Sequence, residues 1–557
     1  MPTWFEQYPG RLEFEFQALR GAGYKFSLDE KQKAAGRIVL YVEYPIEVTS
    51  HTLTALFPDL YPYFPVEIFA PTFPDGRHKH PHNGLLCTLQ DPHENWHTDD
   101  TLAGFLGTQV KVILEAHLNP GGADGREAHE GAQASGYYTY QPMTAVLTGD
   151  WSIPPDRQHG RLVIGIEPYS DPNQMLRGVV LEVQDENGQS LAHIDPTIAA
   201  RHREKLTARW VRLATPPPDG NKILDSAVAI WPEVNIPRFK HGPDIVGLLI
   251  PEEAGYLEPT ENWVFVVRTK ERGSRNIQGY LARADRFSRQ DIQSRIPKLA
   301  PLATKKILIV GLGAVGATCA LQLARAGVAS INLMDFDHVQ IGNLPRWQLG
   351  YSAIGRPKVE VLASFIAQEY PLVSVKDYLH RLGSGHDNQV LSSALENVDL
   401  ILDATAEWCV SHYLSDTAKR LEIPYVWATG TPGSYGGIVG RIVPGETEGC
   451  WKCFQNHVND KTIAAPHQDL APGVQPVGCF HPTFTGTGFD MDHVALAAVR
   501  LVASTLCEGN KNGYPDFNWD VGVLNLWDDG DQPIASTWVT YPLRRHENCH
   551  CHDKSAI

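Results

Sequence analysis

The stretch Lys306-Ile-Leu-Ile-Val-Gly311-Leu-Gly313-Ala-Val-Gly316 places a short apolar run directly before three closely spaced glycines. This order predicts a buried strand, a tight turn, and a helix whose N-terminus can hold a phosphate group. Asp335 lies nineteen residues after Gly316, at the end of the next apolar run. A carboxylate near this spacing commonly holds a ribose hydroxyl. The pattern predicts a Rossmann-like domain that binds a nucleotide at the glycine turn.

Polar and cationic residues follow Asp335 at the positions where such a domain meets its ligand. Asn343 and Arg346 lie in the next loop, and Arg346 can place its guanidinium on phosphate oxygens. Lys358 opens the following predicted helix and can neutralise charge that builds at an α-phosphorus. Asp403 ends the run Val-Asp-Leu-Ile-Leu-Asp, at the carboxyl edge of the sheet, where a carboxylate suits Mg²⁺. Hydride transfer needs none of these cations, so the set favours ATP used for adenylation over NAD. An ordinary dinucleotide-binding domain or a ligand-free turn are the alternatives.

The chain divides into three regions by sequence texture. Residues 1–146 end in a glycine-rich loop and an aromatic patch, and residues 147–280 contain alternating runs typical of strands. Residues 281–557 alternate predicted strands and helices, which predicts a doubly wound, mostly parallel sheet. We therefore expect an α/β multidomain protein with a strand-rich middle.

The composition limits the possible partners and location. The chain has 557 residues and a net charge of −16, with no long basic stretch, which disfavours general binding to nucleic acid or anionic membranes. No apolar run approaches the roughly 18 residues of a membrane span, and the N-terminus lacks a signal pattern. We expect a soluble cytoplasmic protein. The nine cysteines are an odd number, which argues against a disulfide framework.

Paired cysteines in the C-terminal region have the spacing of a metal site. Cys450-Trp-Lys-Cys453 forms one half, and the His-rich segment that contains Cys549 and Cys551 supplies the other. A tetrahedral Zn²⁺ site takes four such ligands, and with all four from the protein it is structural. His546 or His552 could replace Cys551, and free thiols beside a His-rich tail are the alternative.

The C-terminal region resembles the adenylating domain shared by ubiquitin-activating enzymes and the bacterial activators of sulfur carriers. The resemblance covers about residues 284–557 and begins at Arg286-Phe-Ser-Arg289-Gln. It implies that Arg289 reaches the ATP site of a partner subunit, and hence a homodimer through this domain. It also implies structural Zn²⁺, here at Cys450, Cys453, Cys549 and Cys551. The departures are Gly-Ala-Val-Gly in the glycine turn and Asn-Leu-Pro-Arg-Trp in the loop.

The same resemblance gives Cys479 a role, because it lies where the family places a thioester-forming cysteine on a crossing loop. A thiolate there would attack the acyl adenylate, and a buried structural cysteine is the alternative. Cys319, Cys409 and Cys507 lie in predicted helices, and we expect them in the core.

The N-terminal region resembles the core of ubiquitin-conjugating enzymes over about residues 10–140. It has a Tyr61-Pro strand, a His80-Pro-His-Asn83 turn, then Cys87, Trp96 and a helix from about Thr101 to Ala116. The resemblance makes Cys87 the acceptor of the thioester carried by Cys479. The family's turn reads His-Pro-Asn, so the hydrogen-bond donor for the oxyanion, His82 or Asn83, stays open. A buried thiol in a binding-only domain is the alternative.

Together the two resemblances imply a fused conjugating and activating enzyme, as in CBASS antiphage operons and related ubiquitin-like systems. A C-terminal glycine, of a ubiquitin-like protein or of a cyclic-nucleotide synthase, would be adenylated, passed to Cys479 and Cys87, and joined to a target lysine. A sulfur-carrier adenylyltransferase with a binding-only N-terminal domain is the second hypothesis. A non-enzymatic scaffold or an NAD-binding regulator is the third.

Overall fold

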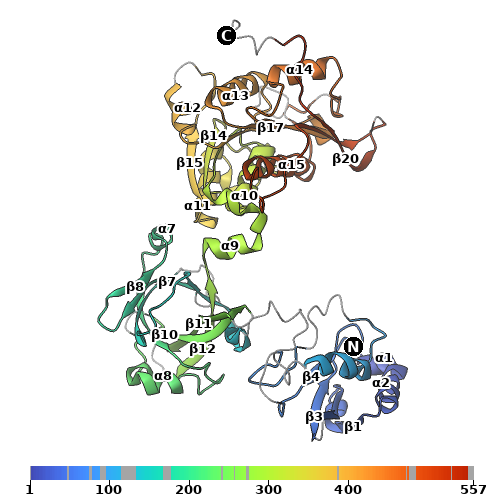
Figure 1. The fold of residues 1–557 in the computed structure, drawn as a ribbon, viewed down its shortest axis with the longest axis vertical. Helices are drawn as coiled ribbons and strands as arrows, with labels where there is room; N and C mark the ends of the chain where they lie inside the picture. Colours follow the sequence, from blue (N-terminus) through green and yellow to red (C-terminus); the bar gives the residue numbers. More distant parts are fainter. Residues whose placement is uncertain are drawn as a thin grey trace. The chain divides into compact units, whose positions relative to one another are not determined.

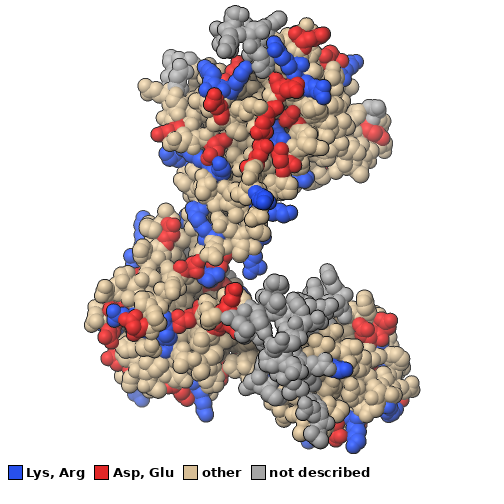
Figure 2. All heavy atoms as spheres, viewed as in Figure 1, with Lys and Arg blue, Asp and Glu red and all other residues tan. Residues whose placement is uncertain are grey.

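The structure is a computed structural model in which the chain forms two compact units, residues 1–287 and 288–557 (Figure 1). It describes residues 2–46, 49–73, 78–87, 96–113, 133–166, 177–239, 242–255, 258–270, 275–384, 388–471, 473–475, 484–528 and 530–549. Within these ranges, every helix is too short or too polar to cross a bilayer. Basic and acidic side chains are interspersed on the face of each unit drawn in Figure 2.

The first part of the N-terminal unit is a small antiparallel sheet with helices. The strands β1 (Lys25–Leu28), β2 (Val39–Ile46), β3 (Thr49–Leu56) and β4 (Glu67–Phe69) pair in sequence order. The helices α2 (Pro9–Gly21) and α5 (Leu102–Phe105) contact each other, and their buried side chains share one core with the sheet. The strand expected from Tyr61 onward is wrong for its first half: Tyr61 lies in a turn, and β4 begins only at Glu67. Two prolines in this segment have no N–H to donate to a ladder.

The rest of the N-terminal unit is rich in strands, as predicted for the middle of the chain. Its strands are β5 (Tyr140–Thr148), β6 (His159–Ile166), β7 (Arg177–Asp185), β8 (Ser190–His193), β9 (Lys205–Arg212), β10 (Asp244–Gly255), β11 (Glu258–Lys270) and β12 (Ile277–Arg286). The sheet order is β5-β12-β11-β10-β9-β6-β7-β8, and β5 also pairs with β7, so the sheet closes on itself. The boundary expected at residue 280 falls inside β12, which belongs to this sheet.

The C-terminal unit is a single mixed sheet covered on both faces. Its strands are β13 (Lys306–Val310), β14 (Ser330–Asp335), β15 (Ser374–Leu379), β16 (Leu400–Asp403), β17 (Tyr425–Gly430), β18 (Gly436–Ile442), β19 (Val521–Trp527) and β20 (Pro533–Tyr541). The order is β15-β14-β13-β16-β17-β18-β19-β20, in which the strands from β15 to β17 are parallel and the last three antiparallel.

Side-chain alternation along β13 shows why helices cover both faces. Ile307 and Ile309 pack in the core with the helices α10 (Ala314–Arg325), α11 (Lys358–Glu369) and α15 (Gly488–Cys507). Leu308 and Val310 point into a second core with α12 (Asn388–Ala394), α13 (Trp408–Leu421) and α14 (Trp451–Asn459). Successive residues of a strand face opposite sides of the sheet. The strand is therefore apolar from Ile307 to Val310, as a doubly wound sheet requires.

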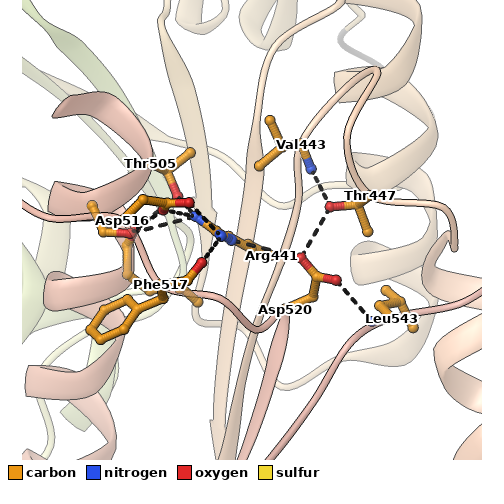
Figure 3. A network of polar contacts seen from close by, with 10 residues as sticks. Arg441, Val443, Thr447, Thr505, Asp516, Phe517, Asp520 and Leu543 are labelled. Carbon is orange, nitrogen blue, oxygen red and sulfur yellow. Dashed lines mark hydrogen bonds and ion pairs between the residues drawn. The ribbon is translucent and has the colours of Figure 1, made fainter. Parts of the chain in front are cut away.

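A buried arginine ties the antiparallel part of this sheet to its surroundings (Figure 3). Arg441 on β18 donates to Asp516 Oδ1 at 2.7 Å and to the Phe517 carbonyl at 2.6 Å. Its Nη1 also lies 3.3 Å from the Thr505 hydroxyl on α15. Asp520, on the other side, accepts a hydrogen bond from the Leu543 amide at 2.8 Å. The network thus connects β18 and α15 to residues 542–549, the segment after β20, which we call the C-terminal arm.

Candidate functional site

The three glycines of the turn between β13 and α10 have different structural roles. Gly311 has a φ of +85°, and a Cβ there would meet the Ala404–Thr405 peptide at 2.8 Å. A Cβ on Gly316 would lie 1.9 Å from the Gly311 carbonyl oxygen. A Cβ on Gly313 would meet nothing within 4 Å. The outer glycines are thus needed for packing, whereas the middle one leaves space at the N-terminus of α10.

Asp335 holds the turn from the neighbouring strand. Its Oδ2 accepts the Leu312 amide at 2.6 Å, and its Oδ1 accepts the Asp337 amide at 2.8 Å. Asp335 ends β14 beside β13, so the carboxylate and the turn meet at the same edge of the sheet. The sequence prediction that these two features lie together is confirmed in the structure.

A cavity of about 230 Å³ opens at this edge. Its lining combines the glycine turn, the end of β14, the start of α11 and the loop before α13. The lining residues are Val310, Gly311, Gly313, Met334, Asp335, Phe336, Asp337, Lys358, His380, Arg381, Leu382, Ala404, Thr405, Glu407 and Val410. The space beside Gly313 and the free N–H groups of a helix N-terminus suit a phosphate group. The cavity therefore fits the nucleotide that the sequence predicts.

Lys358 is the cation that faces this cavity most directly. It is the first residue of α11, its side chain is 8% exposed, and its Nζ lies 2.5 Å from Asp337 Oδ2. The backbone strengthens the pair, because the Lys358 amide also donates to the Asp337 carbonyl at 3.0 Å. Asp337 thus holds the ammonium in place at the edge of the cavity.

Arg346 and Asn343 lie in the adjoining loop, outside the lining of the cavity. Arg346 donates to the Gly342 carbonyl at 3.3 Å, and its guanidinium lies 5.3 Å from the centre of the Phe484 ring. Partial burial lowers the pKa of Arg346. Asn343 closes the loop by accepting the Gln340 amide at 2.9 Å. Turning the Arg346 side chain would be needed to bring it onto a ligand in the cavity.

Trp347 explains one departure from the family pattern. Its indole Nε1 donates to the Leu312 carbonyl of the glycine turn at 2.8 Å, and its side chain is buried. The tryptophan in Asn-Leu-Pro-Arg-Trp therefore anchors the loop of Arg346 to the glycine turn.

Asp403 is close to the cavity but presents no oxygen to it. The residue is 1% exposed. Its Oδ1 accepts the Thr405 amide at 2.9 Å and the Thr405 hydroxyl at 2.7 Å. Its Oδ2 accepts the Ser411 hydroxyl at 2.7 Å and the Tyr425 hydroxyl at 2.8 Å. The carboxylate thus organises the loop after β16, and the Mg²⁺-binding role expected from the sequence stays a prediction.

Glu407 was missed by the sequence analysis although it lines the cavity. It is exposed and directly precedes α13, with its amide 3.3 Å from the Thr405 hydroxyl. Its position four residues after Asp403 is the signal that could have drawn attention to it. His380 and Arg381, which follow β15, also line the cavity and were not anticipated.

Two expected residues cannot be placed in this site. Arg289 opens α9 (Arg289–Arg295) and donates to the Leu372 carbonyl of its own unit, which does not test a role in a partner subunit. Cys479 lies outside the described residues, and so do Cys551 and His552.

The three described cysteines of the expected metal site come together as predicted. The sulfur of Cys450 lies 3.8 Å from that of Cys453 and 3.6 Å from that of Cys549. All three sulfurs lie within 4.8 Å of one another and are buried. The hydrogen bond from Cys450 lowers the pKa of Cys453 to about 4. Thiolate sulfurs in this arrangement fit Zn²⁺.

A neighbouring group, His457, Asp460 and His546, is held by hydrogen bonds. His546 Nδ1 accepts the Asn548 amide at 3.0 Å, which places the imidazole proton on Nε2. That nitrogen lies 2.8 Å from Asp460 Oδ2 and donates to it. Because both nitrogens are engaged, His546 does not serve as the fourth ligand in this arrangement.

The cysteines that were expected in the core differ in burial. Cys319 and Cys507 are buried as expected, and burial raises the pKa of Cys507. Cys409 is exposed, so its assignment to the core was wrong. It is the second residue of α13 and lies on the solvent-exposed side of the first helical turn. The buried face of this helix begins at Val410.

Cys87 is exposed and follows a tight turn in the N-terminal unit. Its amide donates to the His78 carbonyl at 2.7 Å. Within the turn, Asn83 Oδ1 accepts the Leu85 amide at 3.0 Å, and His80 Nδ1 accepts the His82 amide at 3.2 Å. Asn83 and His80 therefore shape the turn.

Other residues of the expected pattern in the N-terminal unit can be placed as well. The His82 ring lies 5.2 Å from that of Tyr138, and burial lowers the pKa of His82. Trp96 is buried and donates to the Pro62 carbonyl at 2.8 Å, and Thr101 caps α5 as the expected helix begins. The oxyanion donor stays a prediction.

The glycine turn, the carboxylate at the end of β14 and the cation at the start of α11 meet at one edge of a doubly wound α/β domain. Residues 287–499 match the ThiF family, and the chain belongs to this family.

Individual proteins resemble this chain over different shares of its length. The chain is 30% identical to the sulfur carrier protein ThiS adenylyltransferase of Escherichia coli strain K12, over 44% of this chain and 86% of the relative. It is 27% identical to the uncharacterized protein y4oA of Sinorhizobium fredii, over 99% of this chain and 97% of the relative. The crystal structure of E. coli MccB is 18% identical and covers 47% of this chain and 72% of its own, with a TM-score of 0.36.

Proposed function

We propose that this chain adenylates the C-terminal carboxylate of a protein substrate at the cavity beside the glycine turn. The observation that carries the proposal is the meeting of Gly313, Asp335 and Lys358 around one cavity. The family supports the reaction class, because its sulfur-carrier relative is named as an adenylyltransferase. The test is exchange of labelled pyrophosphate into ATP in the presence of candidate proteins ending in glycine. Absence of exchange with every candidate, together with nicotinamide-dependent hydride transfer, would overturn the proposal.

The chemistry assigns a role to each side chain around the cavity. Asp335 holds the ribose hydroxyls, and the N-terminus of α10 holds phosphate oxygens. A carboxylate oxygen of the substrate attacks the α-phosphorus, forming an acyl–phosphate bond as the bond to the bridging oxygen breaks. Pyrophosphate leaves with the electron pair, while Lys358 and Arg346 stabilise the charge that develops on the phosphates.

Divalent and structural metal ions complete the proposal. Mg²⁺ neutralises the phosphates when it is bound, and the carboxylates on the cavity wall are the oxygen ligands it prefers. Structural Zn²⁺ would be held by Cys450, Cys453 and Cys549, with Cys551 as the fourth ligand. Four protein ligands leave no open position, so this zinc would stabilise the fold and take no part in the reaction.

We further propose that the activated carboxylate is passed along two thiols. The Cys479 thiolate attacks the acyl carbon, the C–S bond forms, and AMP leaves. The Cys87 thiolate then takes the acyl group by thioester exchange, and a lysine amine finally displaces Cys87 and loses a proton. The exposed thiol of Cys87, directly after an ordered turn, supports this second half of the proposal. A ubiquitin-like protein or a cyclic-nucleotide synthase would supply the glycine, as in antiphage defence systems.

The competing proposal is a sulfur-carrier adenylyltransferase with a binding-only N-terminal region. The similarity to the ThiS adenylyltransferase favours it, because that relative is named as acting on a sulfur carrier protein. The two proposals differ at Cys87, which sulfur transfer does not need. Detection of acyl adducts on Cys87 in cells would favour conjugation over sulfur transfer.

Dimerisation through the C-terminal unit is the last part of the proposal. Phe489 and Leu496, one heptad apart on α15, are exposed at 72% and 45%, and Ile341 is exposed at 75%. Gly488 at the start of α15 lies against Pro345, so this helix begins beside the loop that follows Ile341. Sedimentation of the full chain should show a dimer, and Phe489→Asp should shift it to the monomer. In mixed dimers of one active and one inactivated subunit, Arg289→Ala should lower exchange when it is placed in the inactivated subunit and leave exchange intact when it is placed in the active one.

A further inference from the structure

We infer that Glu407, and not Asp403, is the carboxylate of this chain that faces the divalent cation of bound ATP. The inference rests on the proposed function and makes it specific at one position. It starts from a simple requirement: a cation ligand needs an oxygen that is free to leave the protein's own hydrogen bonds and that faces the cavity.

The carboxylates beside the cavity can be compared by their partners. Asp403 has both oxygens occupied by Thr405, Ser411 and Tyr425 and is 1% exposed. Taking it as a ligand would break those bonds and leave buried hydroxyls unpaired. Asp403 is therefore a positioning residue.

The two carboxylates at the end of β14 are committed as well. Asp335 uses one oxygen for the Leu312 amide and the other for the Asp337 amide. Asp337 accepts the His338 amide at 2.8 Å on Oδ1 and pairs with Lys358 through Oδ2. Each of these side chains already has both carboxylate oxygens engaged within the protein.

Glu407 differs from all of them. It is exposed, it lines the cavity, and within the part of the chain that the structure describes its carboxylate has neither an ion pair nor a hydrogen bond. A glutamate before a helix often caps it, but α13 has no side-chain cap hydrogen bond at Glu407. Its oxygens are thus available to a ligand.

The loop from Asp403 to Glu407 has the shape that this role requires. Ala406 has a φ of +58°, in the left-handed region that alanine disfavours. The bonds from Thr405 to Asp403 hold the loop on one side, and the Thr405 peptide packs against Gly311 on the other. Asp403 therefore fixes the bend that carries Glu407 to the cavity. Mg²⁺ commonly takes one or two protein carboxylates together with phosphate oxygens and water, so a single free glutamate is sufficient.

The test measures cation binding directly, with Mn²⁺ as the spectroscopic probe and α,β-methylene-ATP as the nucleotide. Glu407→Gln in the full chain should weaken Mn²⁺ binding to the protein–nucleotide complex about tenfold or more, by electron paramagnetic resonance. Its unfolding temperature should stay at the wild-type value, because the side chain has no structural partner. Glu422→Gln, an exposed change at the other end of α13, is the matched control and should bind Mn²⁺ as the wild type does.

Asp403→Asn provides the contrasting result. It should lower the unfolding temperature, because it weakens the hydrogen bonds that shape the loop, and raised Mn²⁺ should not restore its nucleotide binding. Raised Mg²⁺ should partly restore pyrophosphate exchange by Glu407→Gln. Wild-type Mn²⁺ affinity in Glu407→Gln, with binding lost only in folded Asp403→Asn, would overturn the inference. If the wild type itself bound no nucleotide, the proposed function would fail first, so the two failures are distinguishable.

Discussion

Lys358 is the residue on which the proposed adenylation depends most. Its ammonium lies 2.5 Å from Asp337, and both residues line the cavity. Lys358→Ala should lower the rate of pyrophosphate exchange by about two to three orders of magnitude, the loss typical of removing one stabilising group from a transition state. The measurement is exchange at saturating ATP and substrate.

Lys358→Arg separates charge from geometry at this position. Arginine keeps the positive charge but replaces a compact ammonium with a planar fork. Partial recovery of exchange would indicate charge neutralisation, whereas wild-type exchange in Lys358→Ala would remove the residue from the mechanism. Retained folding of each variant is checked by circular dichroism.

The glycines of the turn provide a second prediction at this scale. Gly313→Ala adds a methyl group where nothing lies within 4 Å, so stability should change little while nucleotide binding weakens. Gly316→Ala places a methyl group 1.9 Å from the Gly311 carbonyl oxygen and should destabilise the unit by about 1–3 kcal/mol. Thermal unfolding and nucleotide titration measure the two effects. Equal loss of stability in both variants would contradict the distinction.

At the scale of elements, the network around Arg441 makes stability depend on pH. Burial alone would raise the pKa of Asp516, but hydrogen bonds from Arg441 and Ser504 outweigh it and lower the pKa. A depressed carboxyl pKa contributes stability above the unfolded value of about 3.9, and that stability is lost as the pH falls through the folded pKa. Glu508 has the opposite effect on the pH dependence of stability, because burial, Glu446 and Asp516 raise the pKa of its carboxyl group.

Asp516→Asn tests this dependence. At pH 7 it should cost about 1–2 kcal/mol, a modest figure because the carboxyl is 37% exposed. The difference from the wild type should stay nearly constant from pH 7 to pH 4 and shrink below about pH 4, as measured by urea unfolding at several pH values. Asp377→Asn, an exposed change on β15, should show no such trend. A cost that does not shrink between about pH 4 and pH 2 would sink the explanation.

The cysteine centre stabilises α14 and the C-terminal arm as elements. Cys450 and Cys453 flank the first turn of α14, and Cys549 comes from the arm, so a metal ion would cross-link segments far apart in sequence. We expect about one zinc per chain by elemental analysis, and loss of the ion in Cys549→Ser. Chelation should lower the unfolding temperature of the wild type more than that of the variant. Folded, fully stable protein without zinc would contradict the assignment.

Across the whole chain, the sequence predicted the secondary-structure elements of the site well. It did not predict which side chains from distant segments contact one another. The turn from Gly311, the strand that ends at Asp335 and the helix from Lys358 formed where expected, because each is set by nearby residues. The burial of Asp403 depends on Tyr425, which lies on another strand, and no local signal reports it. In the same way, no local signal reports that His546 is hydrogen-bonded to Asp460 and so is not available to the expected metal site. The strand expected at Tyr61 failed because the prolines that follow it cannot donate to a ladder, although the tyrosine itself is buried as in a strand.

The last prediction concerns the order of transfer between the two reactive thiols. If the activated group passes first to Cys479, Cys87→Ala should leave pyrophosphate exchange intact and accumulate a thioester on Cys479. Cys479→Ala should leave exchange intact and abolish charging of Cys87, because an acyl adenylate in the cavity has no other acceptor in the proposed route. Non-reducing electrophoresis and mass spectrometry identify each thioester by its sensitivity to thiols. Charging of Cys87 at the wild-type rate in Cys479→Ala would reverse the proposed order. Full activity toward a sulfur carrier in Cys87→Ala would instead favour the adenylyltransferase alternative, in which the N-terminal unit only binds the substrate.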